Sequence, residues 1–470
     1  MPKALAVFET ELAQLPINQH RDIGALHDDI GNILLTQGDI PAALKSYRSA
    51  MTIAQQLIDS DPSNSQWQHD LWVSHSKIGD ILMAQSDASA ALQSYRSHMA
   101  IAQQLAASDP NNSQWQRALS ASHSSIGDNL LAQKNSLHTR QSYRSAMTIA
   151  QQLADSDPSN SQWQRDLSVA HSNIGDLLMA QSDGPAALQS YHSAMTIAQQ
   201  LADGDPENSY WQHDLARSHI GIGNSQQIQD NSPAAQQSYE SAMKIIQRLS
   251  DSDPCNSQWQ HNLAGLYHNI GDSLLAEDNK LAAQQSYESA MRIIQQLADS
   301  HPSNKQRQQE LAECHSKIGD SLLAQDNNLA AQQSYRKAMT IIKQLTDSNP
   351  SNNQWQQALH ALHNNIGDSL LAQSNSLAAR QHYRSAMTII LQLASNHFTS
   401  LWNRDLSVTQ RKIGDSFERQ GKITEALAAY QLSLLIAQSL ALYFPEEQQL
   451  QTDIKIIKRR LQALQAQNKD

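Results

Sequence analysis

A repeat of 48 residues is the feature of this sequence that most constrains its fold. Tryptophan recurs at this spacing, or at a multiple of it, from Trp67 to Trp355. An Ile-Gly-Asp or Ile-Gly-Asn triplet keeps the same period through nine copies, with the last copy shifted by one residue. The triplets begin at Ile30, Ile78, Ile126, Ile174, Ile222, Ile270, Ile318, Ile366 and Ile413. A fixed period of this length is typical of arrays in which each copy is one supersecondary unit.

The apolar spacing within one copy predicts two helices. Trp67, Leu71 and Ile78 recur at intervals that place them on one face of a helix with 3.6 residues per turn, and a second stripe covers residues 91–105. A short polar turn at residues 85–87 separates the two stripes. A Ser-Asp-Pro-Ser-Asn segment at residues 60–64 ends one helix with proline and offers an asparagine to cap the next. We therefore predict an all-α fold of nine helical hairpins.

Stacking of the hairpins follows from their apolar surfaces. A single hairpin with apolar residues on two sides of each helix cannot bury them, so successive copies must pack into a solenoid. The glycine of the triplet lies in the middle of a predicted helix, where glycine costs about 0.5–1 kcal/mol relative to alanine. Its recurrence indicates a position where a neighbouring helix comes too close for a side chain.

The pattern of one copy resembles the tetratricopeptide repeat. The residues that carry the resemblance are His75, Ile78-Gly79, Leu82, Ala91, Tyr95 and Pro110, with Ala146 and Ala194 at the second small position of other copies. The usual repeat has about 34 residues, so these copies resemble the longer units of some bacterial tetratricopeptide proteins. The resemblance covers residues 17–445 and implies a right-handed α-α superhelix whose first helices line a concave surface.

The two ends of the array are predicted to be covered by helices. Residues 1–16 resemble a truncated second helix that would cap the first copy, and residues 446–470 form a C-terminal capping helix. The apolar stripe of the latter is Leu450, Ile454, Ile457, Leu461 and Leu464. Its basic run from Lys455 to Arg460 has a nuclear-import or nucleic-acid patch as its alternative interpretation.

The candidate binding residues are the polar residues that end each triplet. They are Asp80, Asp128, Asp176, Asn224, Asp272, Asp320, Asp368 and Asp415, with Asn32 in the first copy. Helical spacing places them opposite the apolar stripe, so we expect them to face solvent. The resemblance places them along the concave surface, where stacked carboxylates would attract a basic or amide-rich peptide. The alternative is a solvated face that duplication copied. An arginine follows the repeated tyrosine in five copies, which predicts a more basic opposite wall.

No catalytic or metal site is predicted. Histidine recurs three residues before the triplet in seven copies, but zinc ligands must lie within about 2.0–2.1 Å of one ion and equivalent residues of adjacent repeats do not. We interpret these histidines as half-buried packing residues. Gly221-Ile222-Gly223 repeats the local Ile-Gly rather than forming a phosphate loop, and no cofactor motif is present. We expect no enzyme activity and no cofactor.

The composition limits the partners and the compartment. A formal net charge of −11 disfavours nucleic acid, because phosphate contacts need clustered Lys and Arg. Two cysteines cannot form a disulfide framework, and no uninterrupted apolar run approaches the ~18 residues of a membrane span. No signal peptide is recognised at the N-terminus. The default expectation is a cytoplasmic protein, with export without a cleavable signal as the alternative.

The sequence therefore predicts a non-catalytic scaffold that binds a protein or peptide segment in a concave acidic groove. Two alternatives stay open. The array could be the sensor or adaptor part of a regulatory or host-interaction system that recruits effectors, or it could associate with itself as a structural array. Its oligomeric state and the identity of the partner are not encoded in the repeat.

Overall fold

The computed structural model describes residues 17–36, 39–85, 87–133, 135–300, 302–396, 400–444 and 448–467. These residues form 19 helices, and within the described ranges there is no β-strand. The predicted all-α repeat fold is thus confirmed. The capping helix predicted over residues 1–16 lies outside the described residues.

Each 48-residue copy contains a first helix and a second helix. The first helices are α2 (Ile17–Thr36), α4 (Ser65–Ala84), α6 (Ser113–Ala132), α8 (Ser161–Ala180), α10 (Ser209–Ile228), α12 (Ser257–Ala276), α14 (Lys305–Ala324), α16 (Asn353–Ala372) and α18 (Ser400–Glu418). The second helices are α3 (Ile40–Ser60), α5 (Ala88–Ser108), α7 (Ser136–Ser156), α9 (Gly184–Gly204), α11 (Ser232–Ser252), α13 (Lys280–Ser300), α15 (Asn328–Ser348), α17 (Ser376–Asn396) and α19 (Ile423–Tyr443). A last helix, α20 (Gln448–Gln467), follows them.

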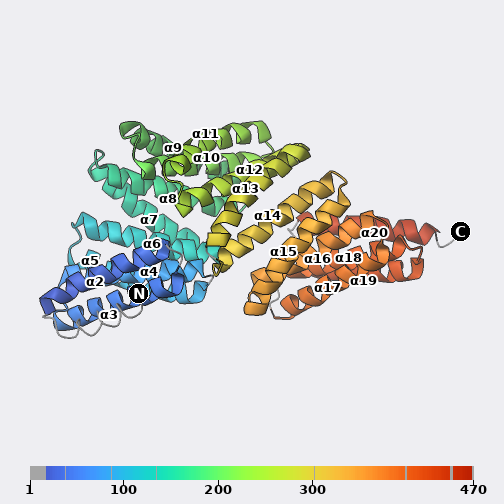
Figure 1. Cartoon of the computed structure of the whole chain (residues 1–470), viewed down its shortest axis with the longest axis horizontal. Coiled ribbons are helices and arrows are strands. Elements are labelled where there is room, and N and C mark those ends of the chain that lie inside the picture. The colour runs from blue at the N-terminus through green and yellow to red at the C-terminus, as the bar shows by residue number, and fades with distance from the viewer. Residues whose placement is uncertain are drawn as a thin grey trace. The chain divides into compact units, whose positions relative to one another are not determined.

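The chain divides into two compact units, Met1–Asn269 and Ile270–Asp470. In each unit the hairpins follow one another along the chain, as Figure 1 shows. From α2 to α11 in the first unit, and from α13 to α19 in the second, each second helix packs against its own first helix and each following first helix packs against it. The core between them is made of small and aromatic residues, such as Ala43 and Tyr47 in the first unit and Ala331 and Tyr335 in the second.

The helix ends use the signals that the sequence analysis identified. Asn64 Oδ1 accepts hydrogen bonds from the backbone N–H groups of Gln66 and Trp67 at 3.1 and 3.2 Å, which caps the start of α4. Between the two helices of a copy, one residue takes a left-handed conformation, as at Ser182 (φ 59°) and Asp326 (φ 59°). Gly421 occupies this position in the ninth copy with φ 70°, so the turn keeps its shape with or without glycine.

Ion pairs between residues 49 positions apart join consecutive copies. Arg21 Nε lies 2.8 Å from Asp70 Oδ2, and Arg404 Nε lies 2.7 Å from Asp453 Oδ2. Arg165 pairs with Asp214 at 2.5 Å, and Arg117 pairs with Asp166. In each pair the arginine belongs to a first helix and the aspartate to the next first helix or to α20. These pairs therefore fix the register between neighbouring copies.

The last hairpin differs from the others in composition. Helix α19 is long and apolar enough to cross a membrane by length and composition alone, with a mean hydropathy of 1.4 over its most apolar window. Glutamines and serines interrupt the apolar residues of α19, so the helix contains no uninterrupted apolar run of this length. Its Tyr430, Ala437 and Leu440 are buried in a core shared with Leu450 and Ile457 of α20, so α19 has the packing of a repeat helix.

Candidate functional site

The polar residue that ends each triplet accepts a hydrogen bond from the tyrosine of its own copy. In the second copy, Tyr95 Oη donates to Asp80 Oδ1 at 2.7 Å. The same bond joins Tyr143 to Asp128, Tyr191 to Asp176, Tyr287 to Asp272, Tyr335 to Asp320, Tyr383 to Asp368 and Tyr430 to Asp415. Asn32 and Asn224 accept it from Tyr47 and Tyr239 at 2.8 Å. The triplet thus has a structural function that the sequence analysis missed.

The triplet glycine makes this bond possible. A Cβ atom added to Gly79 would lie 2.5 Å from a ring carbon of Tyr95, closer than real Cβ contacts allow, and the triplet glycines of the other copies meet their own tyrosines similarly. The tyrosine ring therefore lies flat on the first helix, which brings its hydroxyl to the next residue. This confirms the predicted close approach at the glycine.

Exposure of the triplet residues agrees only in part with the prediction. Asp80, Asp128 and Asp272 are exposed, as expected. The others, Asp176, Asn224, Asp320, Asp368 and Asp415, are half-buried rather than solvent-facing. Side chains of the following copy contact three of them: Arg217 contacts Asp176, Asn365 contacts Asp320 and Lys412 contacts Asp368. We call the surface that these triplet residues share within each unit the Ile-Gly-Asp face.

Cations of the following first helix neutralise several of these carboxylates. Lys317 Nζ lies 2.7 Å from Asp272 Oδ1, and Lys412 Nζ lies 2.5 Å from Asp368 Oδ2. In the first unit, Arg217 reaches Asp176 at 2.6 Å. Lysine precedes the triplet in three of the nine copies, at Lys77, Lys317 and Lys412, and Arg217 occurs in one copy only, so the repeat as a whole did not predict these pairs. The acidic ladder of the prediction is therefore interrupted.

Asp80 and Asp128 stand next to each other in the ladder and form no ion pair among the described residues. Burial raises the pKa of both carboxyl groups, and the hydrogen bonds from Tyr95 and Tyr143 partly offset this effect. Arg217 lowers the pKa of Asp128, and the carboxylates of Asp176 and Asp80 act in the opposite direction. Arg217 thus offsets the repulsion between neighbouring carboxylates at Asp128, and a further positive group near Asp80 and Asp128 would be stabilised by both.

The repeated histidines are packing residues, as predicted. His75, His123, His171, His219, His315 and His363 are half-buried, and His27 is buried. Burial lowers the pKa of each of the six half-buried imidazoles. Within the part of the chain that the structure describes, no group of three or more His, Cys, Asp or Glu side chains could hold a metal ion.

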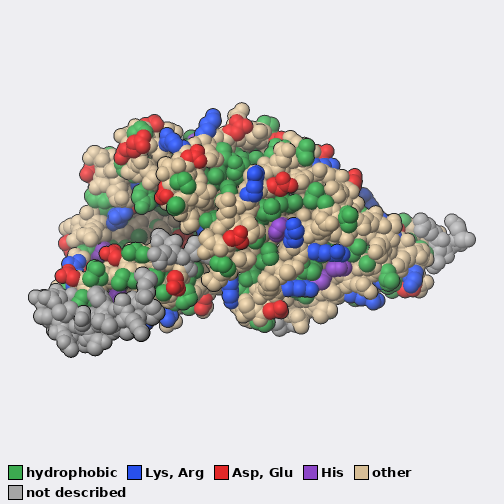
Figure 2. Space-filling model, in the orientation of Figure 1, with side chains coloured by type: hydrophobic (Ala, Val, Ile, Leu, Met, Phe, Trp, Pro, Cys, Tyr) green, Lys and Arg blue, Asp and Glu red, His purple; other side chains and the backbone are tan. Residues whose placement is uncertain are grey.

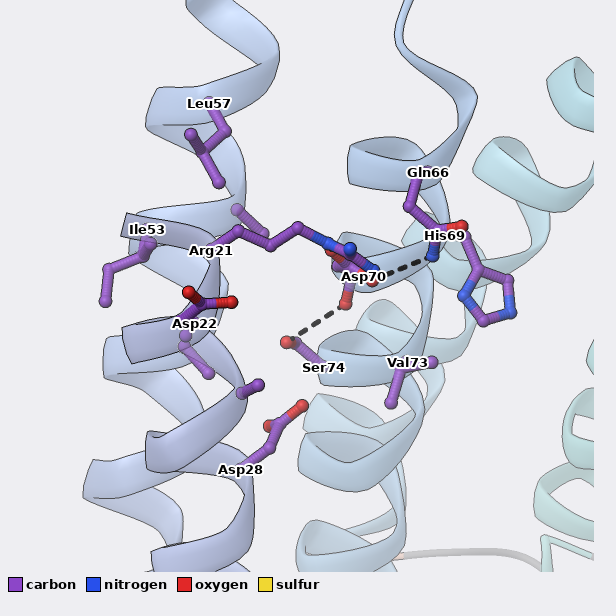
Figure 3. Close-up of a pocket in the computed structure, with 14 residues that line it drawn as sticks. Arg21, Asp22, Asp28, Ile53, Leu57, Gln66, His69, Asp70, Val73 and Ser74 are labelled. Carbon is purple, nitrogen blue, oxygen red and sulfur yellow. Dashed lines mark hydrogen bonds and ion pairs between the residues drawn. The ribbon is translucent and has the colours of Figure 1, made fainter. Parts of the chain in front are cut away.

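A cavity of about 320 Å³ lies between α2, α3 and α4 (Figure 3). It exists because Gly24 supplies no side chain at a position where the second copy has Trp72. Asp28 lines the cavity, and its buried Oδ1 atom has no hydrogen-bond partner among the described residues. Burial raises the pKa of Asp28, although Lys77 lies 3.6 Å from its other oxygen.

The surface in view in Figure 2 mixes acidic, basic and many neutral polar side chains, in line with the low proportion of charged residues (17%). Basic and histidine side chains gather over α15 to α17 of the second unit. The arginines that follow the repeated tyrosine, from Arg48 to Arg384, are exposed, as the sequence predicted.

No protein-family model matches this sequence, and no curated protein matches it. Three solved structures share part of the fold. BtubC from P. vanneervenii is 17% identical with a TM-score of 0.43, and the match covers 54% of this chain and 90% of that one. Apo RapI is 14% identical with a TM-score of 0.44, over 68% of this chain and 97% of that one. A signal transduction ATPase with a tetratricopeptide repeat sensor from Pyrococcus horikoshii is 10% identical with a TM-score of 0.49, over 88% and 55%. Likenesses at this level do not assign a function.

Proposed function

We propose that this protein is a tetratricopeptide-like scaffold without catalytic activity, which binds an extended, basic or amide-rich segment of a partner protein along the Ile-Gly-Asp face. The observation that carries the proposal is the pair of exposed carboxylates at Asp80 and Asp128. Each accepts a hydrogen bond from one tyrosine hydroxyl, and neither forms an ion pair among the described residues, although Arg217 lowers the pKa of Asp128.

Lysine, arginine or amide side chains fit this chemistry. Burial is the main cause of the raised pKa of Asp80 and of Asp128, and a peptide that places cations near both groups would favour their ionised forms. Because such groups remain partly solvated, they contribute more to specificity and to the rate of encounter than to affinity. In the second unit the row of Asp272, Asp320, Asp368 and Asp415 is already covered by Lys317, Asn365, Lys412 and Arg411. The binding segment is therefore assigned to the first unit.

The test is peptide selection from a displayed random library on the full chain. The variant Asp80→Asn/Asp128→Asn removes both charges but keeps the acceptor for tyrosine, since Asn32 and Asn224 accept that bond in the natural chain. We expect selected peptides to be rich in Lys, Arg, Asn or Gln, and to bind the variant about tenfold more weakly.

The matched control is Asp155→Asn/Asp203→Asn, which removes the same charge from exposed positions on second helices. It should bind the selected peptides as the wild type does. Equal binding to the wild type and to the Asp80→Asn/Asp128→Asn variant would refute the proposed site. If no peptide is selected and sedimentation shows concentration-dependent assembly, a self-associating array is the better description.

A further inference from the structure

The second unit carries a dense group of cations on α15 and α17, away from the Ile-Gly-Asp face. The group consists of Arg336 and Lys343 on α15 and Arg384 on α17, all exposed, together with the half-buried His382 on α17. None of the three cations forms an ion pair with a described carboxylate. We call these four residues the basic patch. It stands out in a chain whose net charge is −11.

The electrostatic effects within the basic patch are all repulsive. Arg336 and Lys343 lower the pKa of His382, and Lys343 and His382 lower that of His363 on α16. Burial and Arg384 lower the pKa of the neighbouring Arg380, and Glu425 opposes this effect; the Arg380 guanidinium lies over the Phe417 ring at 4.1 Å. No carboxylate is among the groups that shift either histidine. A negatively charged group bound at the basic patch would therefore be stabilised electrostatically.

A pair of histidines lies within this field. His363 Nδ1 and His382 Nδ1 are 3.1 Å apart, so one ring donates and the other accepts. Burial and the neighbouring cations hold the pKa of His363 near 4 and lower that of His382, so both rings are neutral at pH 7. The titratable and charged groups that act on the pair are His360 on α16 and Arg336 and Lys343 on α15.

Comparison of the second helices shows which residues of the basic patch are specific to this part of the chain. Where α15 has Lys343, the other second helices of the first eight copies have glutamine in six copies and leucine in one. The leucine is Leu391 of α17, which takes the same place as Lys343 one copy later and is 50% exposed. The patch thus combines several cations with one exposed apolar side chain.

We propose that the basic patch on α15 and α17 is a second binding surface that takes an acidic segment of a partner protein carrying an apolar side chain. Charge complementarity favours a polyanion, and Leu391 offers an apolar contact. Proteins that bind single-stranded nucleic acid stack the bases on aromatic side chains, and no Phe, Tyr or Trp of α15 or α17 is exposed. The acidic protein segment is therefore the better fit.

The test is fluorescence anisotropy with a labelled peptide of glutamates interrupted by leucines, added to the full chain. The variant Arg336→Gln/Lys343→Gln/Arg384→Gln should weaken binding at least about tenfold. The control Arg48→Gln/Arg96→Gln/Arg144→Gln removes the same charge from exposed positions on second helices of the first unit, and should bind as the wild type does. Helical content by circular dichroism checks that both variants are folded.

Two further readouts separate this site from a general charge effect. An anionic peptide beside His382 would raise the pKa of the imidazole, so binding takes up a proton and tightens as the pH falls from roughly 7.5 to 6, where glutamates stay ionised. His382→Gln should remove this dependence. Absence of wild-type binding, or equal loss in the control variant, overturns the proposal. Tighter binding of a single-stranded oligonucleotide, lost in the same variant, would overturn the assignment to a protein partner.

Discussion

Asp405 offers the sharpest test of the ion pairs that join consecutive copies. It occupies the position at which Asp166, Asp214 and Asp453 accept an arginine of the preceding copy, but its own preceding copy has Gln357 at the arginine position. Burial raises the pKa of Asp405 from 3.8 to about 6, and the nearby cations only partly oppose this. The carboxylate is thus half-buried without the arginine partner that its equivalents have.

The free-energy cost of ionising Asp405 in the folded state follows from its raised pKa. A carboxyl whose pKa rises from 3.8 to about 6 on folding costs up to ~3 kcal/mol when ionised. Because the side chain keeps some contact with solvent, we expect about 1–2 kcal/mol. The native state binds more protons than the unfolded state between these two pKa values, so the cost is absent below about pH 4 and complete above about pH 6.

The variant Asp405→Asn should therefore raise the free energy of unfolding by about 1–2 kcal/mol near pH 7, with little change near pH 4. Gln357→Arg should also stabilise the protein near pH 7, because it supplies the missing cation, and combining the two should abolish the gain from arginine. Urea denaturation followed by circular dichroism measures these differences. Asp347→Asn, at an exposed position, is the control. A stabilisation of Asp405→Asn that is equal at both pH values would refute the electrostatic reasoning.

Three other predictions follow from the packing. Gly319→Ala should destabilise the protein by about 1–3 kcal/mol in urea, because the new Cβ would lie 2.5 Å from the Tyr335 ring, whereas Gly265→Ala, with nothing within 4 Å, should be neutral or stabilise it by about 0.5–1 kcal/mol. Tyr335→Phe should lower the free energy of unfolding by about 1 kcal/mol, because it removes the hydrogen bond from the hydroxyl to Asp320. An unchanged free energy of unfolding would mean that water replaces the hydroxyl without cost. The melting temperature should fall from roughly pH 7.5 to 5.5, because half-buried histidines with a lowered pKa bind protons more readily in the unfolded state; an unchanged value would contradict this.

The sequence predicted the helices because the apolar stripes, the Pro and Asn signals and the 48-residue period all agree. The bond between Tyr95 and Asp80 was accessible in principle, since the two residues keep the same period with a constant offset of 15 residues. Recognising it required knowing that the tyrosine ring lies over Gly79. The cations that cover Asp272 and Asp368 were not predicted, because a lysine precedes the triplet in only three copies and its partner depends on the packing between copies: Lys317 and Lys412 reach the triplet aspartate of the preceding copy, whereas Lys77 reaches Asp28.

The arginine and aspartate pairs also mean that the copies cannot be exchanged freely, although their backbones are so alike. Removal of the fourth copy would bring Arg117 opposite Asp214, and the charges would still match. Removal of the third copy would instead set His69 opposite Asp166, leaving a carboxylate without its arginine. The order of the copies therefore determines whether each aspartate lies opposite an arginine. Unequal recombination within such a gene would be tolerated at some junctions and selected against at others.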